Sequence, residues 1–152
     1  MNQRNDRPDL SGLTVLVIED DADSREVLRV ALQSHGASVL EAEEVMTAQE
    51  CVRSLTVNLI VTDLALPGRD GAAFLKWLRQ QPHDKGGNLP AIAVTAFDTR
   101  FPPTEVIGWA AYLRKPVDPN ELVKTIAEIL RLPGSAEGSS QSSAHSPASY
   151  SR

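Results

Sequence analysis

Four acidic side chains of this sequence have the types and the spacing to bind a cation or to attack phosphorus. Glu19, Asp20 and Asp21 directly follow the apolar run VLVI, and Asp63 ends a second apolar run, LIVTD. Like charges this close repel, so the cluster needs a cation, contact with water or a raised pKa in one member. Carboxylates without a histidine or thiol beside them suit Mg²⁺, and an aspartate beside that cation can act as a nucleophile.

Two further polar side chains occupy equivalent places, each where an apolar run ends. Thr95 closes the run AIAVT, and Lys115 follows AYLR and precedes Pro116. A hydroxyl and an ammonium group could contact the oxygens of a phosphoryl group held on an aspartate. Phosphoryl transfer depends on such positioning and on the neutralisation of charge in the transition state.

These polar residues need a sheet to bring them together, and the pattern of the chain predicts one. Short apolar runs alternate with helical patterns, and the run LTVLVI is apolar throughout, as in a strand buried on both faces. We predict strands at residues 14–18, 38–41, 58–62, 91–95 and 111–114, and helices at residues 22–35, 44–54, 71–81 and from residue 119 onward. The alternation implies an α/β fold with a doubly wound parallel sheet, which binds ligands at the carboxyl ends of its strands.

The predicted helices differ in how clearly the sequence marks them. One side of the first helix should be buried, through Val27, Leu28, Ala31 and Leu32. The last helix has a well-marked start, because Asp118 can cap it and Pro119 suits its first position. The segment 98–110 contains two adjacent prolines and Gly108, so we expect the fourth helix there to be short or irregular.

The bulk composition limits the class of protein. The chain has 152 residues, which fits one domain with tails, and its net charge of −5 argues against a nucleic-acid partner. A single cysteine, Cys51, excludes an internal disulfide and a cysteine metal cage. No apolar run reaches membrane-spanning length, and the N-terminus has no signal-peptide core. We therefore expect a cytoplasmic protein with no membrane partner.

The two ends of the chain differ in composition from its middle. We expect a flexible leader at residues 1–11, a folded domain at residues 12–132 and a disordered Ser-rich tail at residues 133–152. The tail nearly lacks large apolar groups, so it cannot bury enough surface to offset its ordering entropy. No pattern typical of a DNA-binding or catalytic domain follows residue 132, and we expect the folded domain to act alone.

The residues at four strand ends resemble the signatures of bacterial response-regulator receiver domains of the chemotaxis (CheY-like) type. The matching segments, in order along the chain, are VLVIEDD, VTDLALPGRDG, AVTA and YLRKP. The leader LSGLTVLVIEDD and the ending KPVDPNEL are also similar to the receivers of hybrid sensor kinases. The resemblance implies a flavodoxin-like (βα)5 fold with strand order 2-1-3-4-5, an order that the chemotaxis receiver also has.

The same resemblance implies a role for each acid in a two-component phosphorelay. Asp63 would be the phosphoacceptor, receiving its phosphoryl group from a histidine of a sensor kinase or of a histidine phosphotransfer protein. Asp20, Asp63 and the backbone carbonyl of Ala65 would bind Mg²⁺, for which Mn²⁺ could substitute, and Glu19 would act through water. Asp21 falls outside this acidic pair and could start the first helix.

The resemblance also assigns the residues that would respond to phosphorylation. Thr95 would move toward the phosphoryl group, and Lys115 would pair with it. Tyr112 matches an aromatic switch position, although a plain edge-strand aromatic fits it equally well. Pro116 would follow a cis peptide bond. Such a domain is not an enzyme acting on other molecules, because it catalyses only its own phosphorylation and dephosphorylation, and it signals to a downstream protein by contact.

Three other functions fit parts of the pattern. A haloacid-dehalogenase-type phosphatase needs a second aspartate two residues after its nucleophile, where this chain has Ala65. A flavodoxin-like flavin binder needs Ser, Thr and Gly after the first strand, where acids would repel its phosphate. A receiver-fold interaction module that works without phosphorylation stays open because of the interrupted segment 98–110.

Overall fold

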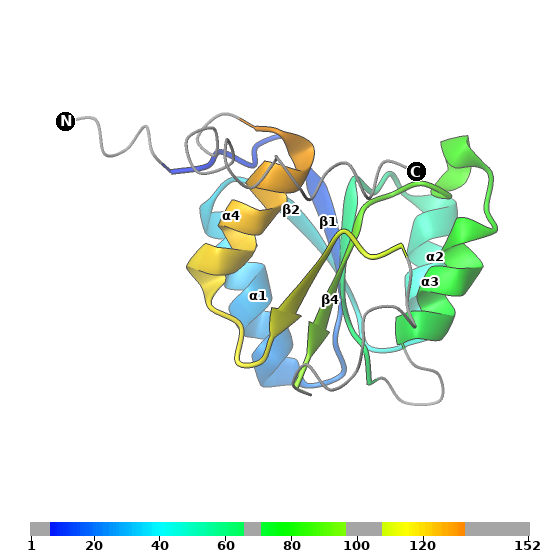
Figure 1. Cartoon of the computed structure of the whole chain (residues 1–152), viewed down its shortest axis with the longest axis horizontal. Helices are drawn as coiled ribbons and strands as arrows, with labels where there is room; N and C mark the ends of the chain where they lie inside the picture. Colours follow the sequence, from blue (N-terminus) through cyan, green and yellow to red (C-terminus); the bar gives the residue numbers. More distant parts are fainter. Residues whose placement is uncertain (1–6, 66–70, 97–107, 133–152) are drawn as a thin grey trace.

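The computed structural model describes residues 7–65, 71–96 and 108–132, and within them strands and helices alternate along the chain (Figure 1). The strands are β1 (Thr14–Ile18), β2 (Ser38–Ala42), β3 (Leu59–Asp63), β4 (Ala91–Thr95) and β5 (Ala111–Arg114). The α-helices are α1 (Ala22–Ser34), α2 (Val45–Ser54), α3 (Gly71–Arg79) and α4 (Pro119–Leu130), and a short 3-10 helix, η2, spans His83–Lys85. Each predicted strand is present, with its ends within one residue of the prediction.

The five strands form one parallel sheet in the order β2-β1-β3-β4-β5. Helices α1 and α4 cover one face and α2 and α3 cover the other, as Figure 1 shows. Successive residues of a strand point to opposite faces, so Leu16 and Ile18 join the core beside α2 and α3, while Val15 and Val17 join the core beside α1 and α4. The predicted doubly wound, flavodoxin-like fold is confirmed.

The register of the sheet brings the predicted site residues to one edge. Ile18 of β1 pairs with Thr62 of β3, so the next residues along each strand, Glu19 and Asp63, lie at the same level. Asp63 pairs in turn with Val94, the residue before Thr95. Because all strands run in the same direction, the polar residues at their carboxyl ends meet at this edge.

One prediction about the first helix is wrong. Val27, assigned to the buried side of α1, is 49% exposed. The stripe that packs on the sheet consists of Leu28, Ala31 and Leu32, and Val27 lies to one side of it. Instead, Val27 borders a shallow groove that α1 forms with Pro119 at the start of α4.

The ends of the folded part bear on the predicted domain boundaries. Leu10 lies inside the predicted leader, yet it is fully buried and its N–H donates to the carbonyl of His35. The packed part of the chain therefore begins before residue 12. The short or irregular fourth helix predicted in the segment 98–110 falls almost wholly on residues 97–107, and the predicted tail falls on residues 133–152, outside the described residues. The label α4 accordingly belongs to the last helix. Of the helices that are described, none combines the length and the apolar character that crossing a membrane requires.

Candidate functional site

The acidic edge of the sheet begins with Glu19, which directly follows β1. Glu19 is only 2% exposed. Its N–H donates to the carbonyl of Ala42 at 2.9 Å, which continues the pairing of β1 with β2. Its carbonyl accepts a hydrogen bond from Nη1 of Arg25 at 2.8 Å. The backbone of Glu19 is thus held on both sides, by β2 and by α1.

The turn from β1 into α1 is closed by Asp21. Its Oδ2 accepts the N–H of Ser24 at 2.8 Å, and its own N–H donates to Oε2 of Glu19 at 3.1 Å. The bonds to Ser24 hold the pKa of Asp21 below its usual value. Asp21 is therefore the N-cap of α1, as predicted, and it also fixes one oxygen of Glu19.

The second buried acid is Asp63, the last residue of β3, which is 7% exposed. Its Oδ1 accepts the N–H of Ala65 at 3.0 Å. The chain then returns to start α3 at Gly71, whose N–H donates to the carbonyl of Leu64 at 2.8 Å. A Cβ on Gly71 would lie 2.5 Å from the carbonyl oxygen of Asp63, so the turn that presents Asp63 leaves room only for glycine.

Lys115 joins the two buried acids from the other side of the site. Its Nζ lies 3.0 Å from Oε1 of Glu19 and 3.0 Å from Oδ2 of Asp63. Its N–H donates to the carbonyl of Thr95 at 2.8 Å, which keeps the end of β5 beside the end of β4. The peptide bond between Lys115 and Pro116 is cis, as the sequence resemblance implies. Glu19, Asp63, Thr95 and Lys115 therefore occupy one small region.

Burial and pairing act in opposite directions on the charged groups of this region. Burial raises the pKa of Glu19, against hydrogen bonds from the Asp21 amide and the Lys115 ammonium that lower it. Burial lowers the pKa of Lys115, but its hydrogen bonds to Asp63 and Glu19 outweigh this and leave it above its usual value. The lysine is thus firmly protonated, whereas the charge on Glu19 is unfavourable where it stands.

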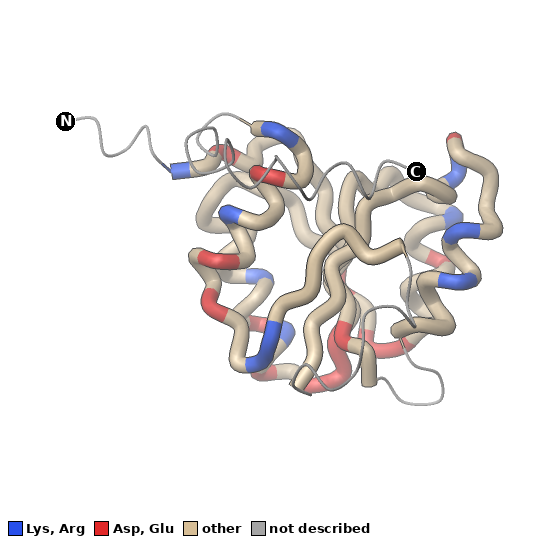
Figure 2. The backbone as a smooth tube through the Cα atoms, viewed as in Figure 1, with Lys and Arg blue, Asp and Glu red and all other residues tan. Residues whose placement is uncertain are grey.

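Carboxylate oxygens at this edge are close enough to share a cation. Glu19, Asp20 and Asp63 each offer one oxygen, and these oxygens lie within 4.8 Å of one another. Acidic residues gather at the lower edge in Figure 2, where the strands end. The ammonium of Lys115 leaves two of the three negative charges uncompensated. An all-oxygen set with two surplus charges fits the preferences of Mg²⁺.

Tyr112, the predicted switch residue, lies on β5 and is half-buried. Its ring meets that of Trp109 edge-on, with ring centroids 6.3 Å apart. Trp109 is buried, which agrees with a packing role for it. This arrangement is compatible with both predictions for Tyr112, a switch and a plain packing residue.

Two residues that contribute to the site were not predicted. Arg25 contacts the carbonyl of Glu19, and Gly71 approaches the backbone of Asp63. No local sequence signal marks Arg25, because its partners come from other elements, whereas the DG pair at residues 70–71 does mark a tight turn.

Comparison with known proteins assigns this chain to a family. The family model described as the response regulator receiver domain matches residues 15–127. An uncharacterized 14.6 kDa protein of Leptolyngbya boryana is 36% identical over 121 residues, covering 78% of this chain and 91% of that protein. The phosphate regulon transcriptional regulatory protein PhoB of Pseudomonas aeruginosa is 33% identical over 126 residues, covering 81% of this chain and 54% of the regulator. This chain thus spans about half the length of that regulator.

A solved structure provides an independent comparison. The receiver domain of a sensor histidine kinase from Pseudomonas aeruginosa, with a magnesium ion coordinated in its active site cleft, superposes with a TM-score of 0.71. The two are 26% identical, and the match covers 80% of this chain and 99% of the other. Sequence and structure agree, and the chain belongs to the family of response regulator receiver domains, the signalling modules of two-component systems.

Proposed function

We propose that this receiver domain accepts a phosphoryl group on Asp63 from a phosphohistidine, in a Mg²⁺-dependent reaction in the cytoplasm. The donor would be a sensor histidine kinase or a histidine phosphotransfer protein, and the output would be contact with a downstream protein. The observation that carries the proposal is the position of Asp63. It is a buried carboxylate at a strand end, bonded to Lys115 and beside two further acids.

In the proposed transfer, a carboxylate oxygen of Asp63 forms a bond to phosphorus while the phosphorus–nitrogen bond of the donor breaks. The electron pair of the broken bond stays on the ring nitrogen, which leaves as neutral imidazole because the other ring nitrogen carries a proton. Lys115, whose Nζ is already 3.0 Å from Oδ2 of Asp63, pairs with the transferred oxygens. The hydroxyl of Thr95 then contacts the same group.

The cation site supports the same reaction. Asp20, Asp63 and the carbonyl of Ala65 would hold Mg²⁺, with Glu19 acting through water, and Mn²⁺ suits the same oxygens. A bound divalent cation offsets the negative charge of the acids and of the incoming phosphoryl group. The magnesium coordinated in the structurally similar kinase receiver supports this assignment.

Signalling would follow from the added charge. A phosphoryl group brings extra negative charge and acceptor oxygens to Asp63. Lys115 and Thr95, which are linked through the backbone at the ends of β5 and β4, would rearrange around it, and Tyr112 would change its packing. A downstream partner would read this change only through its different affinities for the two arrangements.

Phosphorylation can be tested directly by intact mass. The purified protein would be incubated with Mg²⁺ and acetyl phosphate, with Asp63→Asn and a Mg²⁺-free sample as controls. We expect a gain of one phosphoryl group that both controls lose. If neither acetyl phosphate nor a panel of phosphorylated histidine kinases modified the protein, the phosphorylation-independent interaction module would replace this proposal.

A further inference from the structure

We propose that Arg25 is a positioning residue for the cation site, because its guanidinium holds the peptide that joins Glu19 to Asp20. This inference rests on the proposed function only for the identity of the cation. Arg25 touches neither the predicted ligand atoms nor Asp63. It would act through the backbone that carries the first two acids.

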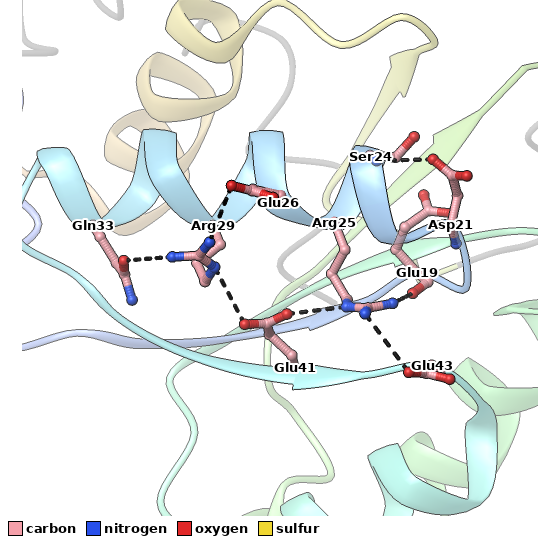
Figure 3. Close-up of polar contacts among 9 residues, drawn as sticks. All are labelled: Glu19, Asp21, Ser24, Arg25, Glu26, Arg29, Gln33, Glu41 and Glu43. Atoms are coloured by element: carbon pink, nitrogen blue, oxygen red, sulfur yellow. Dashed lines mark hydrogen bonds and ion pairs between the residues drawn. The ribbon is translucent and has the colours of Figure 1, made fainter.

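The guanidinium of Arg25 contacts three residues on two separate segments at once. Nη1 donates to the carbonyl of Glu19 at 2.8 Å, and Nε donates to Oε1 of Glu41 on β2 at 3.0 Å. Nη2 lies 3.6 Å from Oε2 of Glu43, just beyond β2. Figure 3 shows the side chain lying between α1 and β2, with its head group directed toward the end of β1. The side chain is only 14% exposed.

The place of Arg25 in α1 explains how it reaches back to β1. Asp21 caps the helix, and the N–H of Arg25 donates to the carbonyl of Asp21 at 2.9 Å, so Arg25 belongs to the first turn. Side chains on an α-helix lean toward its N-terminus. The guanidinium therefore lies over the turn between β1 and α1 rather than over the next turn of the helix.

Holding the carbonyl of Glu19 also orients Asp20. A peptide unit is planar, so fixing this carbonyl fixes the N–H of Asp20 and the direction in which its Cα follows. Asp20 is exposed, and within the described part of the chain its side chain has no hydrogen bond or ion pair of its own. The direction of its carboxylate therefore depends on the backbone that Arg25 holds.

Two acids, one on β2 and one just beyond it, direct the arginine and offset its charge. Glu41 and Glu43 both face the guanidinium, so Arg25 does not present an unmatched positive charge to a cation nearby. Without these partners, the same arginine would weaken cation binding by repulsion. The arrangement therefore keeps the hydrogen bond to Glu19 and limits its electrostatic cost.

Arg29 provides a matched control one turn further along α1. Its Nε lies 3.3 Å from the other oxygen of Glu41, and its Nη2 lies 3.6 Å from Glu26. Its Nη1 donates to Gln33 at 3.2 Å, so its contacts run along the helix and to β2 (Figure 3). None of these contacts reaches the turn that carries Glu19 and Asp20.

The two variants separate positioning from simple electrostatics by the sign of the effect. Replacing either arginine by glutamine removes one positive charge from α1, and Coulomb attraction alone would then make cation binding tighter. Loss of positioning makes it weaker, and contacts of this kind behind a metal site are worth roughly 10- to 100-fold in affinity. We expect positioning to dominate for Arg25 and to be absent for Arg29.

The experiment measures Mn²⁺ affinity of the full chain by the electron paramagnetic resonance signal of free Mn²⁺, at fixed ionic strength. We expect Arg25→Gln to bind Mn²⁺ about tenfold more weakly than the unaltered protein. Arg29→Gln should bind as tightly or slightly more tightly, and Arg25→Lys should fall in between, because one ammonium cannot contact both Glu19 and Glu41. Binding by Arg25→Gln that equals or exceeds that of the unaltered protein would overturn the inference.

A second measurement needs no metal. The N–H of Asp21 donates to Oε2 of Glu19, so its hydrogen-exchange rate reports how well this turn is held. We expect faster exchange in Arg25→Gln and no change in Arg29→Gln, with thermal unfolding confirming that both variants are folded. If the unaltered protein bound no Mn²⁺, the proposed cation site would fail, and unchanged exchange at Asp21 would independently overturn the role of Arg25.

Discussion

The two sides of the site come from strands in different surroundings. Glu19 directly follows β1, and Asp63 ends β3. Both strands lie inside the sheet with a neighbour on each side and are buried along almost their whole length. Lys115 follows β5, an edge strand of four residues that pairs only with β4 and is partly exposed. The acids are thus placed by the interior of the fold. The lysine that would respond to a new charge follows an edge strand.

The largest expected effect comes from breaking the link between the two sides, with Lys115→Met. Without the ammonium, Glu19 and Asp63 are left as buried carboxylates with no cationic partner between them. We expect the free energy of unfolding to fall by about 2–3 kcal/mol at pH 7 in the presence of a chelator. Urea unfolding followed by circular dichroism would measure this loss.

Magnesium should recover part of that loss, because ligand binding to the folded state adds to its stability. Lys124→Met serves as the control, since Lys124 is exposed on α4, away from the acids, and its replacement should change stability by less than about 0.5 kcal/mol. Equal stability of the Lys115 and Lys124 variants would show that the lysine does not hold the two sides together.

The next effect should come from distorting the acid side alone, with Gly71→Ala. The added Cβ would lie 2.5 Å from the carbonyl oxygen of Asp63 and 3.1 Å from Cα of Leu64, so the backbone at the end of β3 must shift. We expect a loss of about 2 kcal/mol in stability, together with slower phosphorylation by acetyl phosphate. In contrast, Gly12→Ala introduces backbone strain at a positive φ but has no atom within 4 Å of its Cβ, so it should leave the phosphorylation rate unchanged. An unaltered rate in Gly71→Ala would contradict the close packing at Asp63.

The contrast between the two sides also separates what the sequence predicts from what it does not. Strand positions follow from short apolar runs, and the parallel topology then places the polar residues that end those runs at one edge. The prediction for Val27 failed because apolar character alone does not tell which of two neighbouring sides of a helix meets the sheet.

The role of Arg25 could not be predicted from the sequence, for a different reason. Its partners are the backbone carbonyl of Glu19, six residues away, and the side chain of Glu41, 16 residues away. Every residue has a backbone carbonyl, so the residue type does not indicate which carbonyl accepts the hydrogen bond. Glu41 comes within reach only because β2 pairs with β1 beneath α1. Contacts of this type need the register and the helix orientation before they can be recognised.

A smaller effect, of opposite sign, is expected from Glu19→Gln. Since burial raises the pKa of Glu19 above its usual 4.5, the folded protein holds a proton there more tightly than the unfolded chain does. The resulting stabilisation is complete below pH 4.5 and is lost as the pH rises through the folded-state pKa, so at pH 7 the ionised carboxylate costs stability.

Glutamine resembles the protonated acid and removes that cost. We expect Glu19→Gln to be more stable than the unaltered protein by about 0.5–1 kcal/mol at pH 7 with chelator present, and to lose this advantage toward pH 4.5. Urea unfolding across this pH range would test it, and Mn²⁺ titration should show weaker binding. A variant less stable at pH 7 would mean that the hydrogen bonds of Glu19 outweigh its burial.

An effect of similar size, but a loss of stability, is expected on the edge side alone, with Arg79→Met. Nη1 of Arg79 donates to the carbonyl of Gly87 at 3.1 Å and Nη2 donates to the carbonyl of Gly108 at 3.2 Å, so the side chain ties the end of α3 to the chain that enters β5. Methionine keeps much of the apolar stem but loses both bonds, and we expect a loss of about 0.5–1 kcal/mol, because the carbonyl of the exposed Gly108 can bond to water instead. Hydrogen exchange at the N–H of Ala110, which donates to Ala91, should become faster, whereas Mn²⁺ affinity should not change. Weaker Mn²⁺ binding in this variant would show that the edge strand also places the acids, and the distinction between the two sides of the site would then fail.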